Sequence, residues 1–288
     1  MIAVNTICVC GAGTMGSGIA QVAAQAGFTT IQFDVNEQML EKSRNTITAN
    51  LSLSVQKGRL SEAEKMQVLE RLSFTAQRKD CVADLIIEAI IEKPEAKIAL
   101  FTELAGYNKP TVVFATNTSS IPVHVIAAGL QYPEQLAGMH FFNPAPLMKL
   151  VEVIRSEQTT DEVTELVAAI AKRMGKTPVI CKDAPGFIVN RVARHYYLEA
   201  MRMVEQGIAT IENVDAVMEA SGFKMGPFRL MDLIGMDINY SVSNIVWEAL
   251  GKPERLTPSV LQKSKVDANE LGRKSGKGFY SYKSQSSK

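Results

Sequence analysis

A glycine motif close to the N-terminus limits the folds that this chain of 288 residues can adopt. The motif lies between an apolar run at residues 6–10, typical of a β-strand, and an amphipathic pattern at residues 15–26, typical of a helix. In that context the first glycine permits a tight turn, the second lets the backbone approach a pyrophosphate, and the third permits close helix–strand packing. The N-terminus of the helix adds N–H donors and a partial positive charge for phosphate groups. The motif therefore predicts a dinucleotide-binding βαβ unit whose cofactor-binding residues are Gly11, Ala12, Gly13, Thr14, Met15 and Gly16.

Asp34 indicates which dinucleotide the unit binds. It ends the second predicted strand, residues 29–34, and follows Gly16 by eighteen positions. A carboxylate at this place can accept hydrogen bonds from both ribose hydroxyls of NAD, whereas it would repel the 2′-phosphate of NADP. We therefore expect NAD as the cofactor. A glycine turn that binds no ligand is the alternative.

The pattern of apolar residues changes about two thirds of the way along the chain. Up to residue 184, short apolar runs alternate with helical patterns, as in βαβ units, whereas after Phe187 only helical patterns occur. The sequence therefore predicts an α/β protein, with a Rossmann-type, mostly parallel sheet at residues 1–184 and an all-α C-terminal domain at residues 185–288. Further strands are expected at residues 85–89, 111–116, 138–142, 150–154 and 179–181, and further helices at 36–57, from the Ser61–Glu64 capping box onward, and at 161–174, 188–206, 210–220, 231–250 and 258–269.

Composition and charge exclude several classes of function. Thirty-one Lys and Arg residues against thirty Asp and Glu residues leave a net charge of +1, so no general basic field exists to hold nucleic acid or an anionic membrane. The N-terminus lacks the features of a signal peptide, and no apolar run is long enough to span a bilayer. The four cysteines lack zinc-ligand spacing, so we expect no metal, and buried, reduced thiols at Cys8 and Cys10. These features favour a cytoplasmic protein.

Three further segments carry side chains suited to the dehydrogenation of an alcohol. Asn117 and Ser119 follow one predicted strand, His140 and Asn143 follow another, and Glu152 lies in the run LVEVI. Because ligands bind at the carboxyl ends of parallel strands, these residues can converge there. The reaction needs a base for the hydroxyl proton, a role that suits histidine, and a carboxylate can orient the ring.

Structural interpretations of the same residues stay open at this point. The chain has three histidines, at positions 124, 140 and 195, and any one of them is more often structural or solvent-facing than catalytic. Glu152 can equally be an edge-strand residue with its carboxylate in water. Ser119 can start a helix, and Asn190 can be a capping residue. Periodicity does not decide among these interpretations.

The combination of motifs resembles a known family. The segments GAGTMGSGIAQVAAQAG, EAIIEKPEAK, NTSS, HFFNPAPLMKLVEVI, KDAPGFIVNR, MGPFRLMDLIGMD and GKGFYSY occur in the order found in L-3-hydroxyacyl-CoA dehydrogenases. The chain is most similar to the short monofunctional 3-hydroxybutyryl-CoA dehydrogenases of that family, and the resemblance covers nearly its whole length. It implies reversible oxidation of an (S)-3-hydroxyacyl-CoA, a 3-hydroxybutyryl-CoA in particular, to the 3-oxoacyl-CoA by hydride transfer to NAD. It also implies a homodimer, with the helical domain serving substrate binding and dimerisation.

The resemblance assigns a role to each matching residue. His140 matches the catalytic base and Glu152 the carboxylate that partners it, while Ser119 and Asn190 match residues that hold the substrate. The residues that match the NAD site, besides the glycine motif, are Asp34, Glu92, Lys97, Asn117, Asn143 and Lys274. Lys57 resembles a lysine near the CoA moiety, and Asn50 stands where the family often has a serine in contact with CoA. The tail reads RKSGKGF rather than the commoner KTG form, which leaves the role of Lys274 open.

Two other functions compete with this interpretation. One is the related sugar-acid, or gulonate-type, dehydrogenase branch, which shares the glycine motif and the histidine. Phe141, Phe142 and the Met148-Lys149 pair favour the acyl-CoA branch. The other is a non-catalytic NAD-binding protein, which loss of the histidine, the glutamate or the asparagine would support. All three residues are present.

Overall fold

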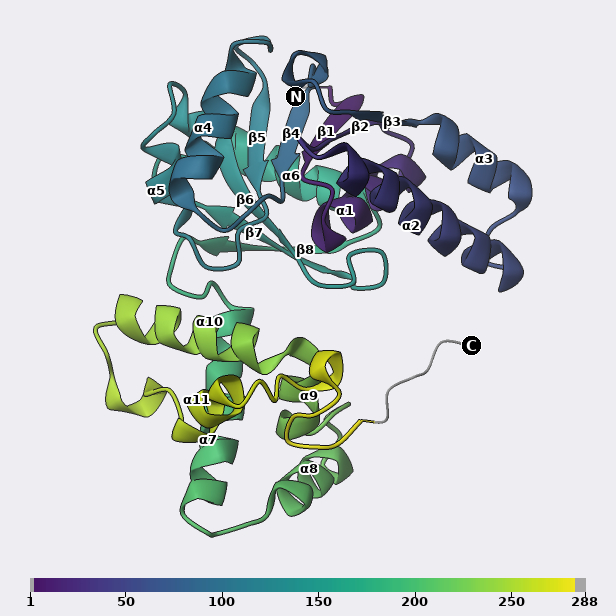
Figure 1. Ribbon diagram of the computed structural model, residues 1–288. Helices are drawn as coiled ribbons and strands as arrows, with labels where there is room; N and C mark the ends of the chain where they lie inside the picture. Colours follow the sequence, from purple (N-terminus) through teal and green to yellow (C-terminus); the bar gives the residue numbers. More distant parts are fainter. Residues whose placement is uncertain (1–2, 283–288) are drawn as a thin grey trace. The chain divides into compact units, whose positions relative to one another are not determined.

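The computed structural model describes residues 3–282, which form two compact units, one ending at Asp183 and the other beginning at Ala184. The first unit contains eight strands and six α-helices (Figure 1). The strands are β1 (Thr6–Cys10), β2 (Thr29–Phe33), β3 (Leu72–Thr75), β4 (Leu85–Glu88), β5 (Val113–Thr116), β6 (Leu136–Phe141), β7 (Leu150–Arg155) and β8 (Thr177–Lys182). The helices are α1 (Thr14–Gln25), α2 (Glu37–Gln56), α3 (Glu62–Glu70), α4 (Pro94–Ala105), α5 (Val123–Ala127) and α6 (Asp161–Arg173).

The eight strands form one sheet in the order β3-β2-β1-β4-β5-β6-β7-β8. All neighbouring pairs are parallel except β6 and β7, which are antiparallel. The chain leaves β1 toward one edge of the sheet and returns to add β4 on the other side of β1, so the strand order reverses between these two strands. In open α/β sheets ligands bind outside the carboxyl ends of the strands at such a reversal.

Helices cover both faces of the sheet. Ile7, Val9 and Ile87 pack in one core with residues of α1 and α6, and on the opposite face the Phe114 ring of β5 lies 4.9 Å from the Phe101 ring of α4. Strands β4, β5 and β6 are buried along their whole length, as continuous apolar strands covered on both faces should be. Figure 1 also shows α2 and α3 extending outward beside the edge strand β3.

The thiols of the first unit follow the expected alternation along β1. Cys8 and Cys10 are fully buried, and their Sγ atoms lie 3.9 Å apart on one face of the strand. This separation is much longer than a disulfide bond. Cys81 is also buried and Cys181 is half-buried, and all four cysteines are free thiols.

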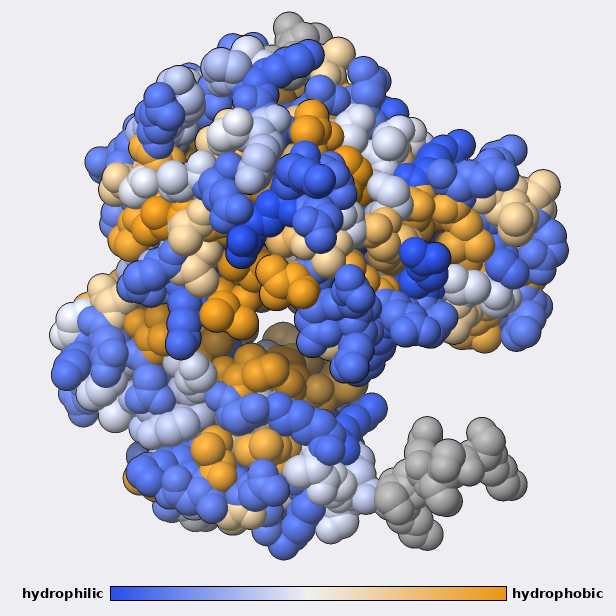
Figure 2. All heavy atoms as spheres, turned by 45° about the horizontal axis from the view of Figure 1, so that its top comes forward, coloured by the Kyte–Doolittle hydropathy of each residue, from blue (hydrophilic) through white to orange (hydrophobic). Residues whose placement is uncertain are grey.

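The second unit is helical throughout its regular structure, with α7 (Val189–Glu205), α8 (Ile211–Ala220), α9 (Pro227–Ile234), α10 (Met236–Ala249) and α11 (Val260–Asp267). Its own core centres on Met201, Phe228 and Met231. Large apolar side chains also remain exposed, among them Val192 and Leu233, and Figure 2 shows hydrophobic patches on the surface of this unit. No helix within residues 3–282 is long and apolar enough to cross a membrane.

Gly235 accounts for the one wrong prediction among the helices of this unit. The single helix expected at residues 231–250 is two helices, α9 and α10, which meet at this glycine with φ +102°. A Cβ at position 235 would also lie 2.9 Å from Lys274 Nζ. The positive φ requires glycine here, whereas the flexible end of the Lys274 side chain could move away from a Cβ. Helical periodicity gives no information about φ.

Three elements of the first unit, β3, α4 and the short helix α5, were not among the expected elements. Strand β3 has four residues, and none of them is fully buried, so it lacks a clear apolar alternation. Helix α4 starts at Pro94, a residue suited to the first turn of a helix. The fold class itself, a mostly parallel Rossmann-type sheet followed by a helical domain, is confirmed.

Candidate active site

The loop between β1 and α1 has the geometry of a nucleotide-binding turn. Gly11 has φ +104°, and a Cβ on it would lie 2.5 Å from the carbonyl oxygen of Ala89. A Cβ on Gly16 would lie 1.9 Å from the carbonyl oxygen of Gly11. Side chains at either position would therefore displace backbone, which explains both glycines physically.

Gly13 is different, because its environment is open. A Cβ at Gly13 would meet none of the described atoms within 4 Å, and φ is not in the left-handed region. Gly13 is also the N-cap residue of α1, and within the described structure no side chain makes a capping hydrogen bond there. A helix N-terminus whose N–H groups are left to a ligand, beside a backbone without a side chain, fits a pyrophosphate.

Asp34 follows β2 directly, and its side chain contacts the loop between β1 and α1. Its Oδ2 atom accepts a hydrogen bond of 2.7 Å from the backbone N–H of Ala12, and its Oδ1 atom accepts one of 2.9 Å from Asn36. The carboxylate is thus fixed beside the glycine loop, where it can receive the hydroxyl groups of a ribose. The residues of this corner fit NAD.

His140 and Glu152 form a buried pair at the end of β6. They lie directly opposite each other in the antiparallel register of β6 and β7, and His140 Nδ1 lies 2.8 Å from Glu152 Oε2. His140 is 6% exposed and Glu152 1% exposed. The other two histidines, His124 and His195, are exposed. The carboxylate therefore holds the ring through one nitrogen, and the solvated edge-strand interpretation of Glu152 is wrong.

Asn117 and Ser119 follow β5 at the same edge of the sheet. The Asn117 side-chain oxygen accepts a hydrogen bond of 2.9 Å from the backbone N–H of Phe141, next to His140. The backbone N–H of Ser119 donates to Glu92 Oε1 at 2.9 Å. Ser119 does not start a helix, because the next helix, α5, begins at Val123. The segment after β5 is therefore held in place beside the histidine.

Glu92 and Lys97 belong to a buried ionic cluster that includes a residue that the sequence analysis did not select. Lys97 is 1% exposed, and its Nζ atom lies 2.7 and 2.8 Å from the two carboxylate oxygens of Glu88 and 3.2 Å from Glu92 Oε2. Burial raises the pKa of Glu88 against the opposing effect of Lys97. The pKa of Glu92 is lowered: burial opposes this, but the nearby Lys97 ammonium and a hydrogen bond from Thr118 outweigh it. Glu88 could have been selected from the sequence, because it is a charged residue within an apolar strand.

The residues expected near the CoA moiety lie on α2. Asn50 is exposed, and its side-chain amide donates a hydrogen bond of 3.1 Å to Gln21. Lys57 is the exposed C-cap residue of the same helix. A spacing of seven residues places both on one side of α2. Asn143 is exposed after β6, where it precedes a cis peptide bond to Pro144.

Two of the expected site residues belong to the second unit. Asn190 is half-buried in the first turn of α7, and the N-cap position of this helix is Ile188, so Asn190 is not the N-cap residue. Lys274 Nζ lies 2.5 and 2.6 Å from the carboxylate oxygens of Asp237, at the start of α10. Lys274 therefore forms an ion pair with a residue of its own unit.

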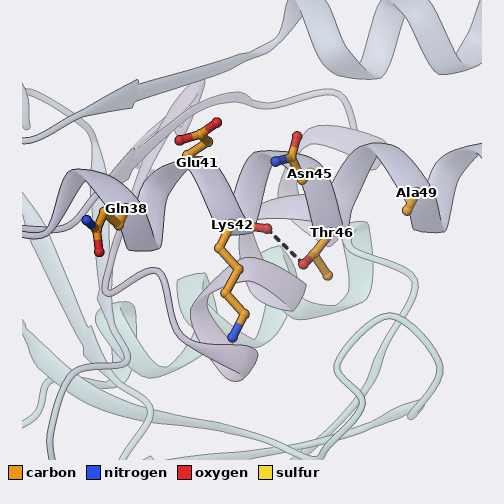
Figure 3. Close-up of a pocket in the computed structure, with 6 residues that line it drawn as sticks. All are labelled: Gln38, Glu41, Lys42, Asn45, Thr46 and Ala49. Carbon is orange, nitrogen blue, oxygen red and sulfur yellow. Dashed lines mark hydrogen bonds between the residues drawn. The ribbon is translucent and has the colours of Figure 1, made fainter. Parts of the chain in front are cut away.

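A shallow hollow on α2 is separate from these residues. Figure 3 shows its lining side chains along the outer face of the helix, where the Thr46 hydroxyl donates to the backbone carbonyl of Lys42. The lining residues are Gln38, Glu41, Lys42, Asn45, Thr46 and Ala49. None of them is an expected site residue, and the groups that suit acid–base chemistry lie at the strand ends instead.

Comparison with known families agrees with this geometry. Residues 6–184 match the model of the 3-hydroxyacyl-CoA dehydrogenase NAD binding domain, and residues 186–282 match the model of the C-terminal domain of the same enzymes. The chain belongs to the 3-hydroxyacyl-CoA dehydrogenase family. The expected family and the NAD cofactor are therefore confirmed, and the expected class of enzyme, an NAD-dependent 3-hydroxyacyl-CoA dehydrogenase, is confirmed with them.

Similar proteins of this dehydrogenase family include both long and short chains. The chain is 44% identical over 287 residues to a 3-hydroxyadipyl-CoA dehydrogenase of Escherichia coli, covering 99% of itself and 60% of that relative. It is 42% identical to a probable 3-hydroxybutyryl-CoA dehydrogenase of Deinococcus radiodurans, covering 95% of itself and 99% of that relative. The crystal structure of a 3-hydroxybutyryl-CoA dehydrogenase from E. coli superposes with a TM-score of 0.95 at 43% identity, covering 99% of this chain and 61% of that chain.

Proposed function

We propose that this member of the family interconverts (S)-3-hydroxybutyryl-CoA and acetoacetyl-CoA. The observation that carries the proposal is the buried His140–Glu152 pair at the strand ends. The 3-hydroxybutyryl-CoA dehydrogenase that the chain matches over nearly the full length of both proteins supports the four-carbon substrate.

His140 is the acid–base group in this proposal. Since Nδ1 faces Glu152, Nε2 is the nitrogen that exchanges a proton with the substrate oxygen. The neutral ring accepts the hydroxyl proton in the oxidation direction, and the imidazolium donates a proton to the 3-keto oxygen in the reduction direction. Glu152 is a positioning residue, because its carboxylate orients the ring through Nδ1. NAD, when bound by the glycine loop and Asp34, supplies the acceptor or donor of hydride.

The other expected residues have supporting roles. Ser119 and Asn190 hold the polar groups of the substrate so that its reacting carbon is correctly placed. Lys57 and Asn50 on α2 contact the CoA moiety. Glu92, Lys97, Asn117, Asn143 and Lys274 complete the cofactor site. In this proposal the domain that ends at residue 184 carries the cofactor, and the helical domain from residue 185 onward serves substrate binding and dimerisation.

We infer that the active protein is a homodimer. Exposed apolar side chains of α9 and α10, including Ile234 and Ile238, support burial of this surface against a second copy. Ile245 of α10 is half-buried. We also infer a cytoplasmic location, which three fully buried free thiols, at Cys8, Cys10 and Cys81, support through their compatibility with a reducing compartment.

Absorbance at the NADH band with acetoacetyl-CoA as substrate tests the proposed activity. Rapid oxidation of NADH is expected, and a six-carbon 3-oxoacyl-CoA and 3-oxoadipyl-CoA should give a lower kcat/KM. A higher kcat/KM with 3-oxoadipyl-CoA would instead assign the specificity of the E. coli relative. Turnover of a sugar acid with NAD, without turnover of any acyl-CoA, would support the gulonate-type alternative. His140→Ala provides the inactive control.

A further inference from the structure

Glu88 occupies a central position that the proposed mechanism does not use. It is the last residue of β4 and is completely buried. Its carboxylate accepts hydrogen bonds from Thr116 Oγ1 at the end of β5 and from the backbone N–H of Ile90 at 3.2 Å, besides its ion pair with Lys97. A buried carboxylate is costly unless it is paired and hydrogen-bonded, as this one is. The carboxylate therefore joins the ends of two neighbouring strands.

Lys97 links the Glu88 carboxylate to the loop after β4. It lies in the first turns of α4, so its bond to Glu88 closes the connection from β4 to α4. The same ammonium lies 3.2 Å from Glu92, which belongs to that connection. Without Glu88, Lys97 would be left with one partly exposed carboxylate, and its position would no longer be set by a buried partner.

Glu92 in turn organises the segment after β5. Its Oε1 atom accepts hydrogen bonds from the Thr118 hydroxyl at 2.6 Å, from the Ser119 N–H at 2.9 Å and from the Ser120 N–H at 3.2 Å. Glu92 Oε1 thus accepts hydrogen bonds from three consecutive residues, and Glu92 Oε2 faces Lys97. The position of Ser119 depends on Glu92, whose position depends on Lys97 and Glu88.

We infer that Glu88 is a positioning residue that sets the placement of Ser119 through Lys97 and Glu92. The inference rests on the proposed function, in which Ser119 holds the substrate. Displacement of a substrate-holding group by about 1 Å can cost up to about 100-fold in turnover. Loss of the Glu88 charge should therefore lower kcat although Glu88 itself touches no substrate.

The test combines Glu88→Gln with Ser119→Ala. In the wild-type background Glu88→Gln should lower kcat for acetoacetyl-CoA by about 10-fold or more. In the Ser119→Ala background the same change should cost less than about 2-fold, because the group that it positions is already absent. An equal loss in the two backgrounds would show that Glu88 does not act through Ser119 and would overturn the inference.

Asp84→Asn is the matched control. Asp84 immediately precedes the same strand at its opposite end, where it accepts hydrogen bonds from the backbone N–H groups of Asn5 and Thr6 at 2.8 and 2.9 Å. This variant should lower the melting temperature but leave kcat within about 2-fold of wild type. A loss of kcat equal to that of Glu88→Gln at a similar melting temperature would count against the inference.

Thr116→Val keeps the experiment decisive if Glu88→Gln does not fold. It removes the hydrogen bond to Glu88 and the one that Thr116 accepts from the Thr118 backbone N–H, while retaining the ion pair. A smaller loss of kcat, about 3-fold, with the same dependence on Ser119 is therefore expected. An equal effect in both Ser119 backgrounds would again overturn the inference. Wild-type protein without activity toward any acyl-CoA would overturn the proposed function and this inference together, whereas an active wild type with equal losses would overturn the inference alone.

Discussion

The His140 ring and the Glu152 carboxylate face each other across two antiparallel strands, with 2.8 Å between Nδ1 and Oε2. Removal of the ring by His140→Ala should lower kcat by about 10²–10⁴-fold, the usual range for a positioned acid–base group. Glu152→Gln keeps the shape but removes the charge, and should lower kcat by a smaller factor. Steady-state kinetics of the double variant should show strong non-additivity, because the residues act as a unit. Wild-type kcat in Glu152→Gln would make the carboxylate a bystander.

Asp34 should determine the choice of cofactor. Its carboxylate is fixed beside the glycine loop by Ala12 and Asn36, so a 2′-phosphate would meet a like charge. We expect kcat/KM for NADH to exceed that for NADPH by about tenfold or more, since a like-charge contact costs well over 1.4 kcal/mol. Asp34→Asn keeps a hydrogen-bond acceptor but removes the charge, so it should reduce the difference in kcat/KM between NADH and NADPH. Equal use of both cofactors by the wild type would refute this role.

Gly11 and Gly13 should respond differently to alanine. Gly11→Ala introduces a Cβ into the Ala89 carbonyl at a left-handed φ, and should destabilise the fold by about 1–3 kcal/mol. Gly13→Ala meets no described atom within 4 Å, so its melting temperature should stay near wild type while NADH binding weakens. Thermal unfolding and NADH fluorescence titration measure the two effects. Undiminished NADH affinity in Gly13→Ala would show that the pyrophosphate does not approach this residue.

Asn190 should affect turnover more than stability. It is not the N-cap of α7, so Asn190→Ala removes no N-terminal cap. We expect kcat to fall by about 10-fold or more through lost substrate placement, with NADH affinity near wild type. Asn244→Ala in α10, where the amide donates to the Tyr240 carbonyl, is the comparison. A lower melting temperature with normal kcat in Asn190→Ala would identify a scaffold residue.

Cys181 should be unreactive although it is only half-buried. Burial, together with the nearby carboxylates of Glu152 and Asp183, raises the pKa of Cys181 to about 11. The thiolate is the reactive form, so alkylation by iodoacetamide should be slow at pH 8 and rise about tenfold per pH unit below that pKa. Peptide mapping by mass spectrometry measures the rate, and Glu152→Gln should increase it. A rate at pH 8 like that of a free thiol such as glutathione would contradict the expected shift.

Local sequence patterns were sufficient for the fold class and for the glycine loop after β1. The glycine loop could be predicted because its three glycines have the spacing of a dinucleotide-binding turn and lie between a strand and a helix. Asp34 could be predicted because it follows the next strand. Apolar alternation and capping residues predicted most elements to within two residues, including the helix that Ser61 caps. Such signals are local, since they depend on residues that are neighbours along the chain.

Only the tertiary structure decided which distant residues meet. Glu152 faces His140 because β7 is antiparallel to β6 in one particular register, and no periodicity in the sequence specifies a register between strands. In the sequence Glu88 is a charge within an apolar run, and only the fold places Lys97 of the following helix beside it. The break between α9 and α10 likewise lies in the positive φ of Gly235, which helical periodicity does not specify. Chain segments that pack together in space set these contacts, so the sequence alone supplied the candidate groups and the fold supplied their pairing.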